Sequence, residues 1–216
     1  MKKRTVLPLI LIGFLLTLVI MSCKKEDPKE DSQNNTNDNN TEESISIDSD
    51  TQFKINIDGD ELSGISGEDG WASMISNDNS IATDPDTSEG KYGVSISKVD
   101  YFSIHIRKGT NYFIGTVSSD EKFKNFFSPG SYPYADDADD GIFIRIIDDR
   151  SGSNILYKTD GITQNGFFEI IESKEEEAFG NYYMKVHMKF ECTVQDDAGN
   201  TMSITDGEFV ARYENM

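Results

Sequence analysis

The sequence contains little histidine and little positive charge, and each shortage argues against one class of function. It has two histidines, His105 and His187, whereas a zinc site needs three or four converging ligands. We expect both histidines on the polar sides of strands, exposed or hydrogen-bonded. Lys and Arg number 20 against 39 Asp and Glu, so the formal net charge is −19. A chain this acidic repels the phosphate backbone, and we therefore expect no nucleic-acid partner.

A long apolar run occurs at the amino terminus, at residues 6–21. It follows a basic start made of Lys2, Lys3 and Arg4, and it ends at Ser22 and Cys23. The run is shorter than the roughly 20 residues that a transmembrane helix needs. A basic start followed by such a run is typical of a secretory signal, so we expect residues 1–22 to be a signal peptide.

The end of this leader carries a recognisable motif. Ile20-Met21-Ser22-Cys23 resembles the lipobox of bacterial lipoproteins. The resemblance implies cleavage before Cys23 and acylation of its thiol and its new amino group. Each buried CH₂ contributes about 0.8 kcal/mol, so several acyl chains would hold the protein at the membrane. With Cys23 lipidated, Cys192 has no partner for an internal disulfide.

The residues after Cys23 indicate a subcellular location and a spacer. Lys24-Lys25-Glu26-Asp27 resembles the signal by which Bacteroidetes lipoproteins reach the outer face of the outer membrane. That resemblance implies an outer-membrane, cell-surface location. Residues 23–49 are rich in Asn, Asp, Glu and Ser and lack aromatic residues, so we expect a disordered tether. The remaining residues, 50–216, suit one domain.

The pattern of that domain is β-structure. Between Tyr182 and Val194 an apolar residue stands at every second position, which is typical of a strand with one buried face. This pattern places Cys192 on the core face and His187 on the solvent face. Similar alternation predicts strands at 53–57, 94–96, 102–106, 112–117, 142–147, 155–159, 167–171, 182–194, 202–205 and 208–213. Residues 108–111 are expected to form a turn between two of these strands.

These segments, with no alternation of strands and helices, predict an all-β fold. We expect an antiparallel β-sandwich of about nine or ten strands, with a closed β-barrel as the alternative, and one short helix near 120–127. Three phrases, at residues 53–59, 128–132 and 204–209, resemble small all-β lipoprotein domains of unknown function from Bacteroidetes. That family has no assigned reaction, so the resemblance implies fold and location only.

Two groups of residues are candidates for binding. Calcium takes six to eight oxygen ligands, and four carboxylates cluster at Asp136, Asp137, Asp139 and Asp140. Their spacing does not match an EF-hand loop, so we weigh a structural calcium site against a solvated turn and expect no cofactor. Exposed aromatic side chains stack on sugar rings, and the candidates are Trp71, Tyr132 and Tyr134. The competing interpretation is that Trp71 starts a strand and packs in the core.

These observations favour a binding or accessory module at the cell envelope, for a glycan or a partner protein, without enzymatic activity. One alternative is a barrel that holds a small apolar ligand. Another is a hydrolase with a pair of carboxylates, because glycosidases place two acids about 5–9 Å apart across the sugar. An exposed aromatic row would support glycan binding, and an apolar cavity would support the barrel.

Overall fold

A computed structural model describes residues 44–80, 87–136, 141–161 and 164–216 of the chain. The expected signal peptide, Cys23 and three of the four clustered aspartates (Asp137, Asp139 and Asp140) lie outside the described residues. Within the described ranges, no helix has both the length and the apolar character needed to cross a membrane.

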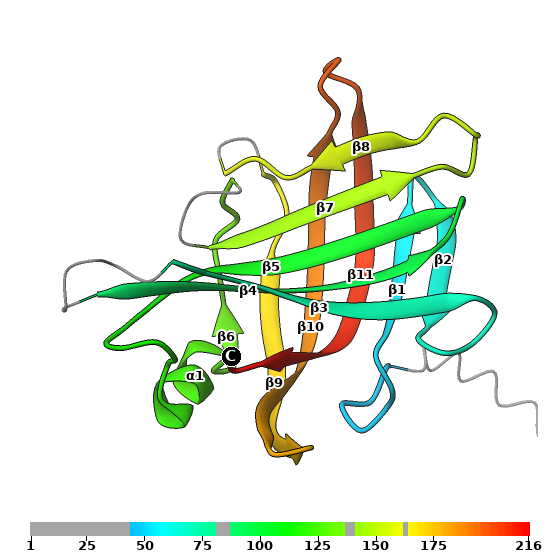
Figure 1. Cartoon of the computed structure of the whole chain (residues 1–216). Coiled ribbons are helices and arrows are strands. Elements are labelled where there is room, and N and C mark those ends of the chain that lie inside the picture. Colours follow the sequence, from blue (N-terminus) through cyan, green and yellow to red (C-terminus); the bar gives the residue numbers. More distant parts are fainter. Residues whose placement is uncertain (1–43, 81–86, 137–140, 162–163) are drawn as a thin grey trace, which may run out of the picture. The chain divides into compact units, whose positions relative to one another are not determined.

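The fold is all-β, as predicted, and the described residues form eleven strands and one short helix (Figure 1). The strands are β1 (Gln52–Ile57), β2 (Asp60–Ile65), β3 (Trp71–Ser80), β4 (Ser88–Lys98), β5 (Phe102–Phe113), β6 (Gly130–Ser131), β7 (Ile142–Asp148), β8 (Ile155–Lys158), β9 (Phe168–Ala178), β10 (Asn181–Gln195) and β11 (Thr201–Glu214). The helix, α1 (Asp120–Phe126), confirms the prediction near 120–127. Its N-cap is Ser119, whose hydroxyl accepts a hydrogen bond from the Lys122 amide.

The strands form one antiparallel sheet that folds over on itself. Its order is β2-β1-β11-β10-β8-β7-β5-β4-β3. On the edge of β10 opposite β11, β9 pairs with residues 181–190 and β8 with Gln195, and β6 lies beyond β9. The halves join where Gln195 of β10 pairs with Lys158 of β8. In Figure 1, β3, β4, β5 and β7 run across β9, β10 and β11. The sheet is sandwich-like and unclosed, because β2 and β3 end the path and no pairing joins them in the described part.

The core fills the space between the two halves of the sheet. Phe53 of β1 stacks on Phe102 of β5, with ring centroids 5.9 Å apart. At the other end Tyr92 of β4 packs against Phe123 of α1, at 4.8 Å. Aromatic side chains from facing strands occupy this volume, so side-chain packing stabilises the fold. The domain has one cysteine, Cys192, and therefore no internal disulfide that could add to this packing.

The structure corrects several predicted element boundaries. Residues 108–111 are not a turn, since β5 runs through them to Phe113, and a bulge between Gly90 and Tyr92 keeps β4 paired with it. The segments 202–205 and 208–213 are one strand, β11, with a shift in pairing register near Asp206. The strand β2 was not among the predicted ones, because its polar residues hide the alternation. The strand β3 begins at Trp71, in agreement with the interpretation that this residue starts a strand.

The central strand β10 matches its prediction on one face and departs from it on the other. Cys192 and the other apolar residues point into the core as expected. His187 is not on a solvated face, because it is only 5% exposed. The segment 44–49, predicted as tether, crosses the outer side of β10. Ser44 bonds to Glu208 on β11, and Asp48 pairs with Lys174 on β9 at 2.7 Å.

Candidate functional site

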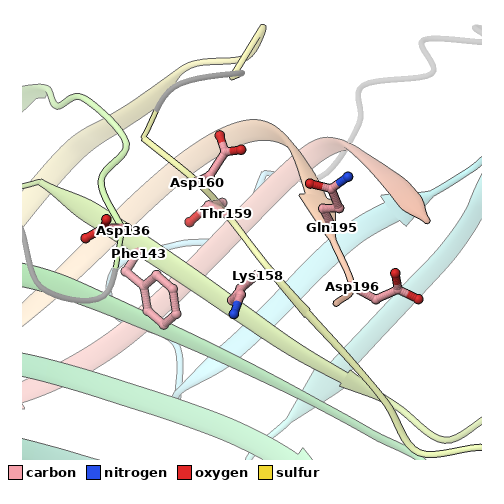
Figure 2. A pocket seen from close by; sticks show the side chains of 7 residues that line it. All are labelled: Asp136, Phe143, Lys158, Thr159, Asp160, Gln195 and Asp196. Atoms are coloured by element: carbon pink, nitrogen blue, oxygen red, sulfur yellow. The ribbon is translucent and has the colours of Figure 1, made fainter. Parts of the chain in front are cut away.

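A pocket of about 380 Å³ opens where β8 meets β10, at the fold in the sheet (Figure 2). Figure 2 shows Asp136 on its left and Gln195 and Asp196 on its right, with Thr159 and Asp160 between them. The volume lies in the range of about 300–1,000 Å³ that is usual for small-molecule sites. Its described lining is Asp136, Phe143, Lys158, Thr159, Asp160, Gln195 and Asp196.

The strands β7 and β8 place an aromatic ring and a hydroxyl in this pocket. Phe143 of β7 points away from the core that its neighbours Ile142 and Ile144 face, because side chains alternate along a strand. The guanidinium carbon of Arg107 lies 5.5 Å from the centroid of the Phe143 ring. Thr159 follows β8 and is fixed twice to Ile144. Its amide donates to the Ile144 carbonyl over 2.9 Å, and its hydroxyl accepts from the Ile144 amide over 3.0 Å.

Two carboxylates come from segments that pack tightly together. The amide of Ala135 donates to the carbonyl of Ile142, which ties the segment before Asp136 to β7. Gly161, next to Asp160, lies so close that a Cβ there would be 3.3 Å from the Ala135 Cα. This contact brings Asp136 and Asp160 to the same pocket although they are far apart in sequence.

The third carboxylate belongs to the turn between β10 and β11. Asp196 accepts hydrogen bonds from the Ala198 amide, at 2.9 Å, and from the Asn200 amide and side chain, at 2.8 Å each. The hydrogen bond from the Asn200 side chain, with those from nearby backbone amides, outweighs the opposing desolvation and keeps the pKa of Asp196 below its ordinary value. Lys158 pairs with Asp197 across 3.3 Å at the rim. The rim of the pocket is therefore charged, and Asp196 stays ionised.

This set of groups suits binding by stacking and hydrogen bonding. The Phe143 ring is 7% exposed and contributes a limited apolar surface to the wall, whereas carboxylate and amide oxygens accept hydrogen bonds. The described lining contains no serine, cysteine or histidine, so nothing in it provides a nucleophile paired with an imidazole base.

The three aromatic residues predicted as a platform are not brought together. Trp71 is 6% exposed and packs edge-on against Phe53 at 5.1 Å between ring centroids. Gly64 makes room for it, since a Cβ at Gly64 would lie 2.5 Å from the indole ring. The core packing of Trp71, which we weighed against the platform, is the arrangement found.

Tyr132 and Tyr134 have different neighbours again. The Tyr132 ring lies under Lys108, whose Nζ is 3.7 Å from the ring centroid, and its hydroxyl donates to the Ser128 carbonyl. The Tyr134 hydroxyl lies 2.8 Å from the carbonyls of both Phe167 and Glu191. Burial is the main cause that raises the pKa of Tyr134. Neither side chain lines the pocket in Figure 2.

The acidic cluster gives no metal site in the part of the chain that is described. Asp136 is exposed and lines the pocket, and its three companions fall outside the described ranges. Among described residues, no three or more His, Cys, Asp or Glu side chains gather as metal ligands would.

A second cluster of polar side chains, centred on Glu208 of β11, has no signature in the sequence. Glu208 accepts hydrogen bonds from Ser44 at 2.8 Å and from His187 at 2.7 Å, and Lys189 lies 3.7 Å away. Serine, histidine and a carboxylate also form hydrolytic triads, but there the histidine bonds directly to the serine. Here Ser44 and His187 both bond to the same oxygen, Oε1 of Glu208, so this geometry provides no proton relay. The cluster instead joins residue 44 to the sheet.

Cys192 provides no thiol chemistry. It is buried on the core side of β10, as its position in the alternation predicts. Burial raises the pKa of its thiol to about 12, although the nearby Tyr134 hydroxyl acts in the opposite direction. Because the thiolate is the reactive form, Cys192 acts as a small apolar residue.

Comparisons with protein-family models, curated proteins and solved structures find no match for this chain. The interpretation of the pocket therefore depends on its own geometry. Of the residues that line the pocket, only Asp136 is a candidate ligand in the sequence, and there for calcium. The other residues were missed because the pocket depends on the pairing of Lys158 with Gln195, which local patterns do not reveal.

Proposed function

We propose that this protein is a lipid-anchored envelope protein whose β-domain is a non-enzymatic binding module for a glycan. The observation that carries the proposal is the pocket between β8 and β10, which combines an aromatic ring with several hydrogen-bond acceptors. It replaces the row of Trp71, Tyr132 and Tyr134 as the place where a sugar would bind.

The chemistry of a sugar matches these groups. A pyranose has C–H groups that pack on an apolar ring, and its hydroxyls donate to carboxylates and amides. In the pocket Phe143 provides the ring, and Asp136, Asp160 and Gln195 provide acceptors. The side chains of Thr159 and Asp196 accept hydrogen bonds from the backbone amides of Ile144 and Asn200, so both side chains are preorganised before a ligand binds.

The proposed location rests on the amino-terminal residues. The basic start, the apolar run and the lipobox-like Ile20 to Cys23 support export and acylation of Cys23. Lys24 to Asp27 support display on the outer face of the outer membrane. At the surface, a tethered domain meets glycans in the medium and on neighbouring cells, whereas its charge of −19 disfavours direct contact with anionic lipids.

The two alternatives have less support. A general acid needs a raised pKa, and hydrogen bonds lower that of Asp196, so Asp196 does not suit that role. A barrel that holds an apolar ligand needs a closed sheet around a cavity. The sheet is unclosed, and aromatic rings fill the space between its halves.

A glycan array tests this proposal. The protein is purified with Cys23→Ser to keep it soluble, and is compared with Phe143→Ala and with Leu156→Ala, a control on the exposed surface of β8. We expect a defined set of glycans to be retained by the parent and the control and lost by Phe143→Ala. An array with no retained glycan, or equal retention by all three proteins, would refute glycan binding at this pocket.

A further inference from the structure

The hairpin of β9 and β10 ends in a phenylalanine that the fold does not use. Ala178 pairs directly with Asn181, so Phe179 and Gly180 alone form the turn. The Phe179 side chain is fully exposed, at 102% of its reference area. In Figure 1 this turn projects from the lower end of β9 and β10. The ring therefore buries no area that would stabilise the domain.

The backbone at this turn is unfavourable for phenylalanine. Phe179 has a φ of +54° and Gly180 a φ of +83°. Two left-handed residues make a type I′ turn, in which Asn-Gly and Gly-Gly are preferred and a bulky residue is strained. A strained residue that contributes no packing indicates a requirement other than folding.

The surface around Phe179 has two different sides. One hollow, of about 310 Å³, is lined by the apolar Ile75 and Val94, by Tyr183, and by the polar Thr51, Ser73 and Arg212. The charge of Arg212 is paired with Glu176. The other, of about 390 Å³, has the carboxylates Asp120 and Glu177 in its lining. An exposed aromatic side chain between a partly apolar hollow and a pair of acidic groups has the composition of a binding hot spot with a polar rim.

We propose that Phe179 anchors this domain to a protein partner that offers an apolar socket for the ring and basic residues opposite Asp120 and Glu177. The acidic rim selects the class of partner. A second copy of this chain, with a net charge of −19, would bring like charges together, and an anionic lipid surface would do the same. This contact is separate from the glycan pocket, which lies at the junction of β8 and β10.

Photo-cross-linking from the full-length chain in the envelope of its own cells tests the partner. A benzophenone amino acid at Asn181, beside the ring, is compared with one at Val99, an exposed residue in the β4–β5 turn. We expect one protein adduct from position 181 and none of that mass from 99. Phe179→Asn should reduce its yield about tenfold or more, and raised salt should also reduce it. No adduct, an adduct with lipid, or an adduct with a second copy would overturn the proposal.

Thermal unfolding of the full-length protein in detergent separates docking from folding. Asn-Gly suits a type I′ turn, so Phe179→Asn should raise Tm, by about 2 °C. Val99→Ala serves as the surface control and should leave Tm unchanged. A fall of several degrees in Phe179→Asn would show that the ring supports the fold, and would overturn its assignment as an anchor.

Discussion

The Nε2 of His187 and the Oε1 of Glu208 lie 2.7 Å apart on the adjacent strands β10 and β11. Ser44 bonds to the same oxygen, so this pair attaches the segment that leads in from the amino terminus. Burial opposes ionisation of Glu208, but hydrogen bonds from Ser44, His187 and the Ile45 amide, with the charge of Lys189, outweigh it. The pKa of Glu208 is therefore lowered, and its ionised form stabilises the fold.

The first prediction concerns the acid sensitivity of this pair. A carboxyl with a lowered folded pKa adds stability above its unfolded pKa, near 4.5, and that stability is lost as the pH falls through the folded value. Glu208→Gln should cost about 2 kcal/mol at pH 7, because it removes a charged acceptor of several hydrogen bonds. Thermal unfolding across pH 3–7 measures this, and the gap from the parent should shrink below about pH 4.5.

The matched control for Glu208 is Glu89→Gln, since Glu89 is exposed on β4, a strand that pairs with neither β10 nor β11. It should leave Tm within about 1 °C of the parent throughout, as surface substitutions do. A gap for Glu208→Gln that persists unchanged at pH 3 would contradict the assignment of an ionised, hydrogen-bonded Glu208.

This pair also marks where local sequence patterns stop being informative. The alternation from Met184 to Val194 predicted β10 and the inward direction of Cys192, because a strand with one buried face imposes a period of two. The same rule placed His187 in solvent. It failed there because residues 44–48, more than a hundred positions earlier, cross the outer side of the strand.

The pocket was unpredictable for a related reason. In the sequence, Phe143 looks like any strand residue, Thr159 like the end of a strand, and Asp160 like the start of a loop. They become a site only through the pairing of Lys158 with Gln195 and the close approach of Gly161 to Ala135. Such long-range register has no local signature. Aromatic content was visible in the sequence, and packing in the core was one of the two interpretations given for Trp71, which the structure shows to be buried.

The second prediction separates Tyr134 from ligand binding. Its hydroxyl bridges the carbonyls of Phe167 and Glu191, and so holds the segment before β9 against β10. Tyr134→Phe should lower the free energy of unfolding by about 1 kcal/mol, as loss of one hydrogen bond does. Chemical denaturation measures this, and glycan binding should be unchanged. If Tyr134→Phe lost glycan binding but kept its stability, Tyr134 would belong to the binding site, which would contradict this prediction.

The third prediction concerns the anchor. Acyl chains on Cys23 would hold the protein in the membrane fraction, so Cys23→Ala should release it to the soluble fraction of the envelope. Cys192→Ala is the matched control, since its thiol is buried in the domain, and this variant should stay with the membrane. Membrane retention of Cys23→Ala would contradict lipidation at this residue.

The central claim is that the pocket between β8 and β10 binds a glycan, and calorimetric titration tests it most directly. The glycan best retained on the array is titrated into the parent protein, Asp160→Asn, Phe143→Ala and the control Leu156→Ala. We predict that Phe143→Ala and Asp160→Asn each weaken binding about tenfold or more, since each loses a contact worth roughly 1–3 kcal/mol. Leu156→Ala should bind as the parent does. Unchanged affinity in both pocket variants would contradict the claim.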